Sequence, residues 1–146
     1  MHGQKTYNGV AILSRSEPAG IERGFADDSD DDAARFIAAR VGPVRVVSVY
    51  VPNGNAVGSD KWAYKMDWMK RLRAWLDRRF AKTDLVALCG DFNVAPEARD
   101  VCDPAGWEPR VLFHPDARAA LEHGRESGLV VAFRVQHEAP GLYSWW

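Results

Sequence analysis

The segment from Ser59 to Phe80 constrains the fold of this chain more than any other part of the sequence. Its large apolar residues recur every three or four positions over about five turns, which is the spacing of one face of an amphipathic helix. These residues are Trp62, Met66, Met69, Leu72, Leu76 and Phe80. Short polar side chains cap helices well, so we predict a long amphipathic helix that is capped by Ser59 or Asp60.

Apolar and β-branched runs lie on both sides of this helix. Residues 10–13 have the pattern of a strand buried on both faces. Residues 36–39 and 44–50 form two β-rich runs with a Gly-Pro turn signal between them, which predicts a hairpin. Residues 85–89 form a continuous apolar run that is typical of a central strand. A second helix is expected from its cap at Asp116 to about Arg125. Strands and helices mix without an internal repeat, so the sequence predicts an α/β fold.

Composition and charge limit the possible functions. The 146 residues are 47% hydrophobic, enough for one sizeable core and for one domain at most. The formal net charge is −1, so contact with nucleic acid must come from a local patch. The most basic stretch is the predicted helix, and we interpret its basic residues as a solvated face. They are Lys61, Lys65, Lys70, Arg71, Arg73, Arg78, Arg79 and Lys82. Five aspartates within residues 27–32 are interpreted as a solvated loop rather than a metal cluster.

Cysteine usage and hydropathy indicate the compartment. Cys89 and Cys102 have no spacing typical of a metal knuckle or a disulfide framework, which favours a reducing compartment. No long apolar run or leader is visible, so we expect a cytoplasmic protein without membrane contact. No pattern sets the oligomeric state, and we expect a monomer. Trp145 and Trp146 would expose apolar area at the end of the chain unless further residues cover them, so a fragment is expected.

Two strand ends carry polar residues that suit phosphate chemistry. Asp91 and Asn93 lie two positions apart after a buried-type strand, so both side chains can point the same way. A carboxylate can orient water, accept its proton or hold a hard cation, and an amide can donate to a phosphate oxygen. Tyr50 and Asn53 follow another strand and add a phenol and a second amide. A Gly-Asp strand end alone is more often a structural turn, so it is the combination that indicates phosphodiester hydrolysis.

Three segments have a highly specific pattern: Tyr7-Asn8-Gly9-Val10-Ala11-Ile12-Leu13, Tyr50-Val51-Pro52-Asn53-Gly54 and Gly90-Asp91-Phe92-Asn93-Val94-Ala95-Pro96. Together they resemble the exodeoxyribonuclease III and abasic-site endonuclease family of the endonuclease/exonuclease/phosphatase superfamily. The resemblance extends over essentially all 146 residues, in the order and spacing of the family. Residues 61–76 resemble its long helix, and residues 142–146 resemble its aromatic segment beside the abasic-site pocket.

This resemblance implies a four-layer α/β sandwich, in which helices flank two packed β-sheets, with residues 1–146 as the central and incomplete part of one such domain. The family cleaves the phosphodiester 5′ to abasic sites and removes nucleotides from 3′ ends of duplex DNA, assisted by Mg²⁺ or Mn²⁺. By analogy the catalytic residues are Tyr50, Asp91 and Asn93, of which Asp91 and Asn93 also contact the metal. Asp91 would activate or orient water, Asn93 would contact the scissile phosphate or the metal, and Tyr50 would steady the phosphate or the leaving oxygen. Contacts to DNA are implied for Asn53, Arg35 and Trp145.

Departures from the family pattern limit these expectations. The family's glutamate metal ligand would lie before Met1, and its terminal Asp-His pair would follow Trp146, so we expect the chain alone to be inactive. The family usually has an acidic residue two positions before Phe133, where this chain has Val131, and this change affects the hydrogen bonding expected near Arg134. Two alternatives remain open: a phosphatase or phosphodiesterase of the same fold that acts on a small substrate, and a non-catalytic DNA-binding fragment.

Overall fold

A computed structural model describes residues 1–143, which form two compact units. The first unit contains residues 1–51 and 83–92, and the second contains residues 52–82 and the described residues from Asn93 onward. The strands of the first unit are β1 (His2–Gly3), β2 (Gly9–Val10), β3 (Ala19–Arg23), β4 (Phe36–Val41), β5 (Val44–Tyr50) and β6 (Val86–Asp91). The helices of the second unit are α1 (Asp60–Arg79), the 3₁₀ turn η1 (Ala98–Asp100), α2 (Pro104–Trp107), α3 (Pro115–Arg125) and α4 (Ala132–Gln136). Two sheets and several helices confirm the predicted α/β class.

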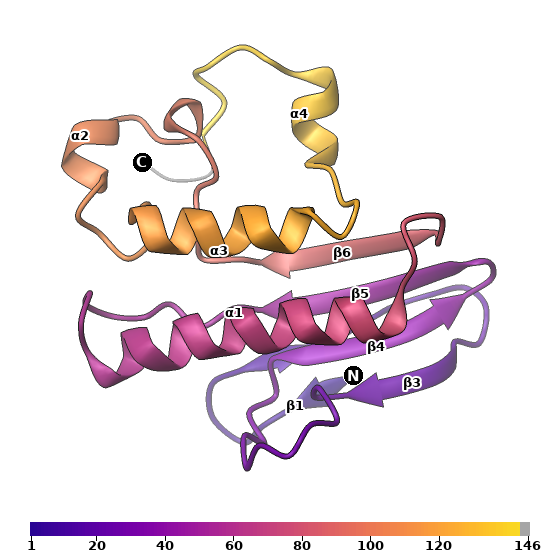
Figure 1. Ribbon diagram of the computed structural model, residues 1–146. Helices are drawn as coiled ribbons and strands as arrows, with labels where there is room; N and C mark the ends of the chain where they lie inside the picture. Colours follow the sequence, from indigo (N-terminus) through magenta and orange to yellow (C-terminus); the bar gives the residue numbers. More distant parts are fainter. Residues whose placement is uncertain (144–146) are drawn as a thin grey trace. The chain divides into compact units, whose positions relative to one another are not determined.

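The larger sheet has the order β3-β4-β5-β6 (Figure 1). Strands β4 and β5 are antiparallel and turn between Val41 and Val44, so the predicted hairpin is confirmed. Strand β4 forms the core of the sheet, because Phe36, Ile37 and the two alanines after them are at most 2% exposed. Strand β6 then joins β5 in the parallel sense. The carboxyl ends of β5 and β6 therefore meet at one edge of the sheet.

Two strand predictions need correction, and one strand was missed. The strand expected at residues 10–13 covers only Gly9–Val10, because its partner is the two-residue strand β1, and Leu13 is 90% exposed. Strand β3 was not predicted, since its sequence Ala-Gly-Ile-Glu-Arg lacks a clear alternation. Strand β6 was expected to be central, but among the described residues it pairs only with β5, and the adjoining Leu85 is 60% exposed. An apolar strand at an edge presents unpaired backbone groups that another strand can use.

Helix α1 begins at Asp60, as predicted, and Ser59 caps it by accepting a hydrogen bond from the Trp62 backbone N–H at 3.2 Å. Its buried face is wider than the predicted stripe, and it includes Lys65 among residues that we had assigned to solvent. Met66 and Phe80 of the predicted stripe are only partly buried. The buried residues are Trp62, Lys65, Trp68, Met69, Leu72, Trp75 and Leu76.

Helix α3 lies against α1 within the second unit (Figure 1). It begins at Pro115, and its cap is His114, whose Nδ1 accepts from the Asp116 N–H at 3.2 Å. The prediction of Asp116 as the cap was therefore wrong, because Pro115 takes the first helical position, where a missing N–H costs nothing. No helix in residues 1–143 is both long and apolar enough to cross a membrane.

Candidate active site

Tyr50 and Asp91 end the two parallel strands of the first unit and are register partners. The Val51 N–H donates to the Asp91 carbonyl at 2.8 Å, which extends the pairing to the last residue of β6. Gly90 precedes Asp91 with φ +134, and a Cβ built there would lie 1.9 Å from the Val49 carbonyl oxygen. Only glycine therefore allows β6 to approach β5 this closely. The structure places the predicted phenol and the exposed carboxylate side by side on neighbouring strands.

Arg35 lies against Tyr50 rather than standing alone on the surface. Its guanidinium carbon is 4.6 Å from the centroid of the Tyr50 ring, and Nη1 donates to the Tyr50 carbonyl at 3.2 Å. The Tyr50 N–H in turn donates to the Arg35 carbonyl at 2.8 Å. Three contacts thus fix the orientation of these two residues, and a cation over a phenol ring is attracted to its π face.

Asn53 and Asn93 belong to the second unit and are joined by a hydrogen bond. Asn53 Nδ2 donates to Asn93 Oδ1 at 3.1 Å, and Asn53 Oδ1 accepts from the Asn55 N–H at 3.1 Å. Asn93 is only 4% exposed and has φ +48, a backbone conformation that asparagine tolerates better than most residues. The contact turns the oxygen of the Asn93 amide toward Asn53 and leaves its NH₂ group directed away from it.

The sequence interpretation missed Lys65 as a residue of this region. Its Nζ donates to the carbonyls of Asn53 at 3.1 Å, Asn93 at 2.7 Å and Val111 at 2.9 Å. The signal was present, because Lys65 stands three residues after Trp62 and thus on the apolar period of the helix. We had grouped it with the basic residues by charge instead of by position.

Asp91 and Asn93 are the predicted metal ligands, and both lie among the described residues. No three His, Cys, Asp or Glu side chains gather into a metal-binding group within residues 1–143. Mg²⁺ usually keeps several waters and takes one or two carboxylates together with phosphate oxygens, so Asp91 suits one of these positions. Trp145, for which the resemblance implies a contact to DNA, lies outside the described residues.

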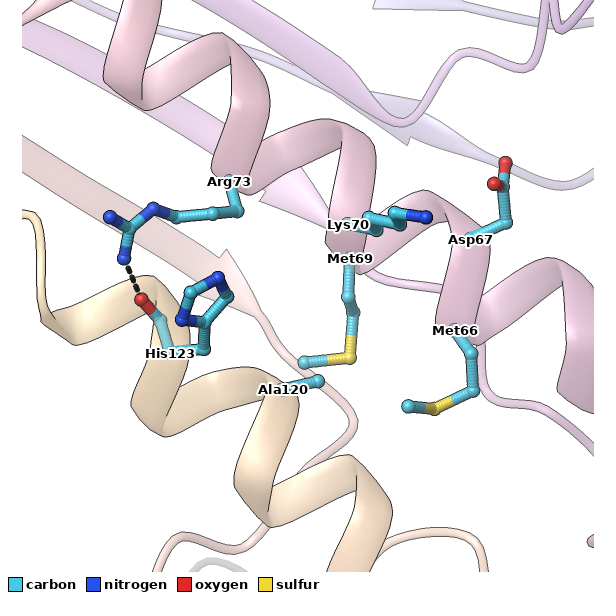
Figure 2. A pocket seen from close by; sticks show the side chains of 7 residues that line it. All are labelled: Met66, Asp67, Met69, Lys70, Arg73, Ala120 and His123. Atoms are coloured by element: carbon cyan, nitrogen blue, oxygen red, sulfur yellow. Dashed lines mark hydrogen bonds between the residues drawn. The ribbon is translucent and has the colours of Figure 1, made fainter.

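A cavity of about 430 Å³ lies between α1 and α3, and none of the predicted site residues lines it (Figure 2). Met66 and Met69 face Ala120 across it, and Arg73 donates to the carbonyl of His123 at its rim. The hydrogen bond to Asp77 raises the pKa of Arg73, so this guanidinium stays charged. The remaining lining residues are Asp67 and Lys70.

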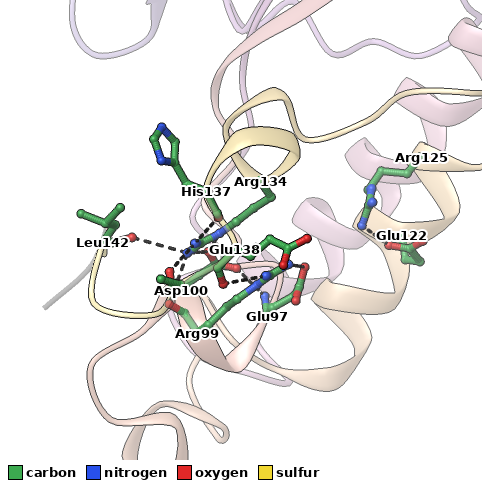
Figure 3. A network of polar contacts seen from close by, with 10 residues as sticks. Glu97, Arg99, Asp100, Glu122, Arg125, Arg134, His137, Glu138 and Leu142 are labelled. Carbon is green, nitrogen blue, oxygen red and sulfur yellow. Dashed lines mark hydrogen bonds and ion pairs between the residues drawn. The ribbon is translucent and has the colours of Figure 1, made fainter.

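A polar network holds the chain after α4 (Figure 3). Arg134 donates through Nε and Nη2 to Asp100 Oδ1 at 2.9 and 2.5 Å, and both side chains are nearly buried. It also donates to the carbonyls of His137 and Ala139, both at 3.0 Å. Nearby, the hydrogen bond to Glu97 raises the pKa of Arg99. The Asp100 carboxylate and the carbonyls of His137 and Ala139 therefore accept the hydrogen bonds of the Arg134 guanidinium.

Val131 is the cap of α4 and makes no side-chain hydrogen bond there. The position at which the family usually carries an acidic residue is therefore an unused capping position in this chain.

Residues 1–145 match the Endonuclease/Exonuclease/phosphatase family. The chain is 32% identical to an exodeoxyribonuclease of Bacillus subtilis over 144 residues, which cover 98% of this chain and 56% of that protein. Among solved structures it resembles the 3′–5′ exonuclease NExo from Neisseria meningitidis, with 39% identity, a TM-score of 0.90, and coverage of 99% of this chain and 56% of that one. A structure of 3′ phosphatase NExo from Neisseria bound to product DNA hairpin gives 38% identity, a TM-score of 0.87, and coverage of 94% and 54%. The chain thus spans about half the length of these relatives, and it belongs to the endonuclease/exonuclease/phosphatase family.

Proposed function

We propose that this chain forms the phosphate-binding part of a Mg²⁺-dependent DNA-repair nuclease. The nuclease would hydrolyse the phosphodiester 5′ to abasic sites and remove nucleotides from the 3′ ends of duplex DNA. The main support is the register pairing of Tyr50 with Asp91 at the carboxyl ends of two parallel strands. Polar residues at such strand ends meet at one edge of the sheet, where a ligand can reach them.

Each residue has a role that fits its surroundings. The exposed Asp91 carboxylate would orient the attacking water or accept its proton. Tyr50, held by Arg35, would donate its phenol hydrogen to a phosphate oxygen or to the leaving oxygen. The NH₂ group of Asn93 would donate to the phosphate, and Asn53 would hold the amide of Asn93 in that orientation.

A bound Mg²⁺ would polarise the phosphate and lower the pKa of a coordinated water. Asp91 would supply one oxygen ligand, and Asn93 would contact the metal or the phosphate. We expect the chain alone to be inactive, because it spans about half the length of the relatives that it matches.

A 3′-phosphatase activity on DNA is the second candidate. The observation that favours it is the similarity to 3′ phosphatase NExo, whose structure contains a product DNA hairpin. The same carboxylate, phenol and amides would then act on a terminal phosphate monoester. A small phosphorylated substrate and a non-catalytic DNA-binding role remain weaker alternatives.

The test compares this chain with an extended protein, in which the flanking coding sequence is added at both ends. Three duplexes serve as substrates in Mg²⁺: one with an internal abasic site, one with a recessed 3′ hydroxyl, and one with a 3′ phosphate. We expect the extended protein to nick the first and shorten the second, whereas the chain alone does neither. Release of phosphate from the third without action on the others would replace the nuclease proposal by the phosphatase.

Asp91→Asn in the extended protein should lower kcat by about 10²-fold to 10⁴-fold, the usual contribution of a general base. Asp67→Asn is the matched control, because it removes an exposed carboxylate from α1 and should change kcat less than twofold. Equal rates for both variants would exclude Asp91 from the reaction.

A further inference from the structure

Lys65 is a buried cation without an assigned role. Its side chain is fully buried, with 0% exposure, in the second turn of α1. Removing an ammonium group from water is costly unless hydrogen bonds replace those of the solvent. A methionine or leucine on this apolar face could be buried at a lower cost in desolvation. The presence of a buried ammonium group therefore has to be explained by the groups that it contacts.

The contacts of Lys65 Nζ converge on the backbone of the two candidate amides. An ammonium group has three N–H donors, and three carbonyls accept from Lys65. Two of them belong to Asn53 and Asn93, which lie 40 positions apart and whose side chains bond each other. The third belongs to Val111, whose neighbour Leu112 accepts from the Ala95 N–H at 2.8 Å. One side chain therefore ties three separate segments of the second unit together.

The stem of Lys65 also supports the loop that carries Asn53. Gly54 has φ +94, and a Cβ built there would lie 3.0 Å from Lys65 Cδ and 3.2 Å from Trp62 Cε3. The Gly54 carbonyl accepts from the Ser59 hydroxyl at 3.2 Å, so the cap of α1 holds the same loop. The loop that carries Asn53 thus packs on the first turns of α1. Lys65 contacts this loop through both the stem and the ammonium group of its side chain.

We propose that Lys65 is a positioning residue that sets the Asn53–Asn93 pair for phosphate binding. It acts on the backbone of both asparagines, so its loss moves the amides without removing them. The role in phosphate binding rests on the proposed function, whereas the control of backbone position does not. Errors of about 1 Å in the placement of a substrate-binding group can reduce rates about 10²-fold.

The experiment uses Lys65→Met, which keeps an unbranched apolar stem like that of lysine and removes the ammonium group. Leu72→Ala in the same helix is the matched control, because Leu72 is also buried but stands about two helical turns after Lys65, and its truncation destabilises α1. Lys65→Arg tests whether a cation of different shape restores the contacts. All variants are made in the extended protein and are measured at temperatures well below the midpoints of their thermal unfolding.

Hydrogen exchange is the first readout and does not depend on activity. The Asn55 and Ala95 amides report on the two loops, because they donate to Asn53 Oδ1 and to the Leu112 carbonyl. Lys65→Met should accelerate exchange at both amides at least tenfold more than Leu72→Ala does. Equal acceleration in both variants, or none in Lys65→Met, would overturn the proposal.

Cleavage of the abasic duplex is the second readout. Lys65→Met should lower kcat/KM by about 10-fold to 100-fold, while Leu72→Ala should stay within threefold. Asn93→Ala should cost much less in the Lys65→Met background than in the wild type, because the amide is already misplaced. Additive effects of the two substitutions would refute the positioning role. If the wild-type extended protein cleaves no DNA, the proposed function fails, and hydrogen exchange alone decides the role of Lys65.

Discussion

Replacement of Arg134 by methionine should destabilise the second unit strongly. The side chain of Arg134 is 6% exposed and that of Asp100 is 12% exposed, so this pair is shielded from water. Removal of the guanidinium leaves a nearly buried carboxylate without its cation, which typically costs about 3–5 kcal/mol. The loss also frees the carbonyls of His137 and Ala139, which hold the chain after α4. We therefore expect Arg134→Met to lower the free energy of unfolding by about 3–5 kcal/mol.

Urea denaturation followed by tryptophan fluorescence measures this change, because the chain has six tryptophans. Arg125→Met is the matched control, since the Arg125–Glu122 ion pair is much more exposed, at 32% for Arg125 and 63% for Glu122, and should contribute less than about 1 kcal/mol (Figure 3). In a double-mutant cycle, Asp100→Asn combined with Arg134→Met should cost at least about 1 kcal/mol less than the sum of the single changes. A loss below about 0.5 kcal/mol for Arg134→Met, the range of ordinary surface changes, would refute the reasoning.

Three further predictions concern single positions. Val131→Asp should raise the free energy of unfolding by about 1 kcal/mol in urea denaturation, because a carboxylate at the cap of α4 can accept from the first N–H groups of this helix. An unchanged free energy of unfolding would show that these N–H groups are already satisfied. Gly90→Ala should lower the free energy of unfolding by roughly 2–4 kcal/mol, since the added Cβ meets the Val49 carbonyl and the residue has a positive φ. An unchanged midpoint of urea denaturation would contradict this prediction. Arg35→Met should lower kcat/KM of the extended protein about threefold to tenfold, because the Tyr50 ring loses its contact with the guanidinium, and Arg35→Lys should restore part of the loss. Equal kcat/KM values for Arg35→Met and the wild type would show that the cation–π contact has no role in activity.

The sequence predicted the elements whose local signals agree with their packing. The hairpin of β4 and β5 has β-branched runs on both sides of a Gly-Pro turn, and α1 has both a cap and a long apolar period. The predictions from sequence were wrong where the burial of a strand depends on distant parts of the chain. The apolar run of β6 was expected at the centre of a sheet, yet apolarity does not tell which neighbouring strand is present.

The candidate site was predicted in its residue types but not in its contacts. Tyr50 and Asp91 could be placed at strand ends, because strand ends are visible in the hydrophobic pattern. Their register depends on the parallel pairing of β5 with β6, which no local signal fixes. Lys65 was assigned to a solvated face, because charge suggests exposure in the absence of a known partner. Arg35 was assigned to DNA contact by the family resemblance alone.

The contrast between the amides and the carboxylate follows from what each has to bind under the proposed function. Asn53 and Asn93 are fixed by each other and by Lys65, and a fixed donor stabilises developing charge without reorganising during the reaction. Asp91 is exposed instead, and Mg²⁺ gives up its waters reluctantly, so a carboxylate that water can reach is suited to a hydrated ion. Preorganisation of the amides and hydration of the carboxylate therefore complement each other. For the same reason, a change that buries Asp91 should impair the use of metal even where the Asn53–Asn93 pair is intact.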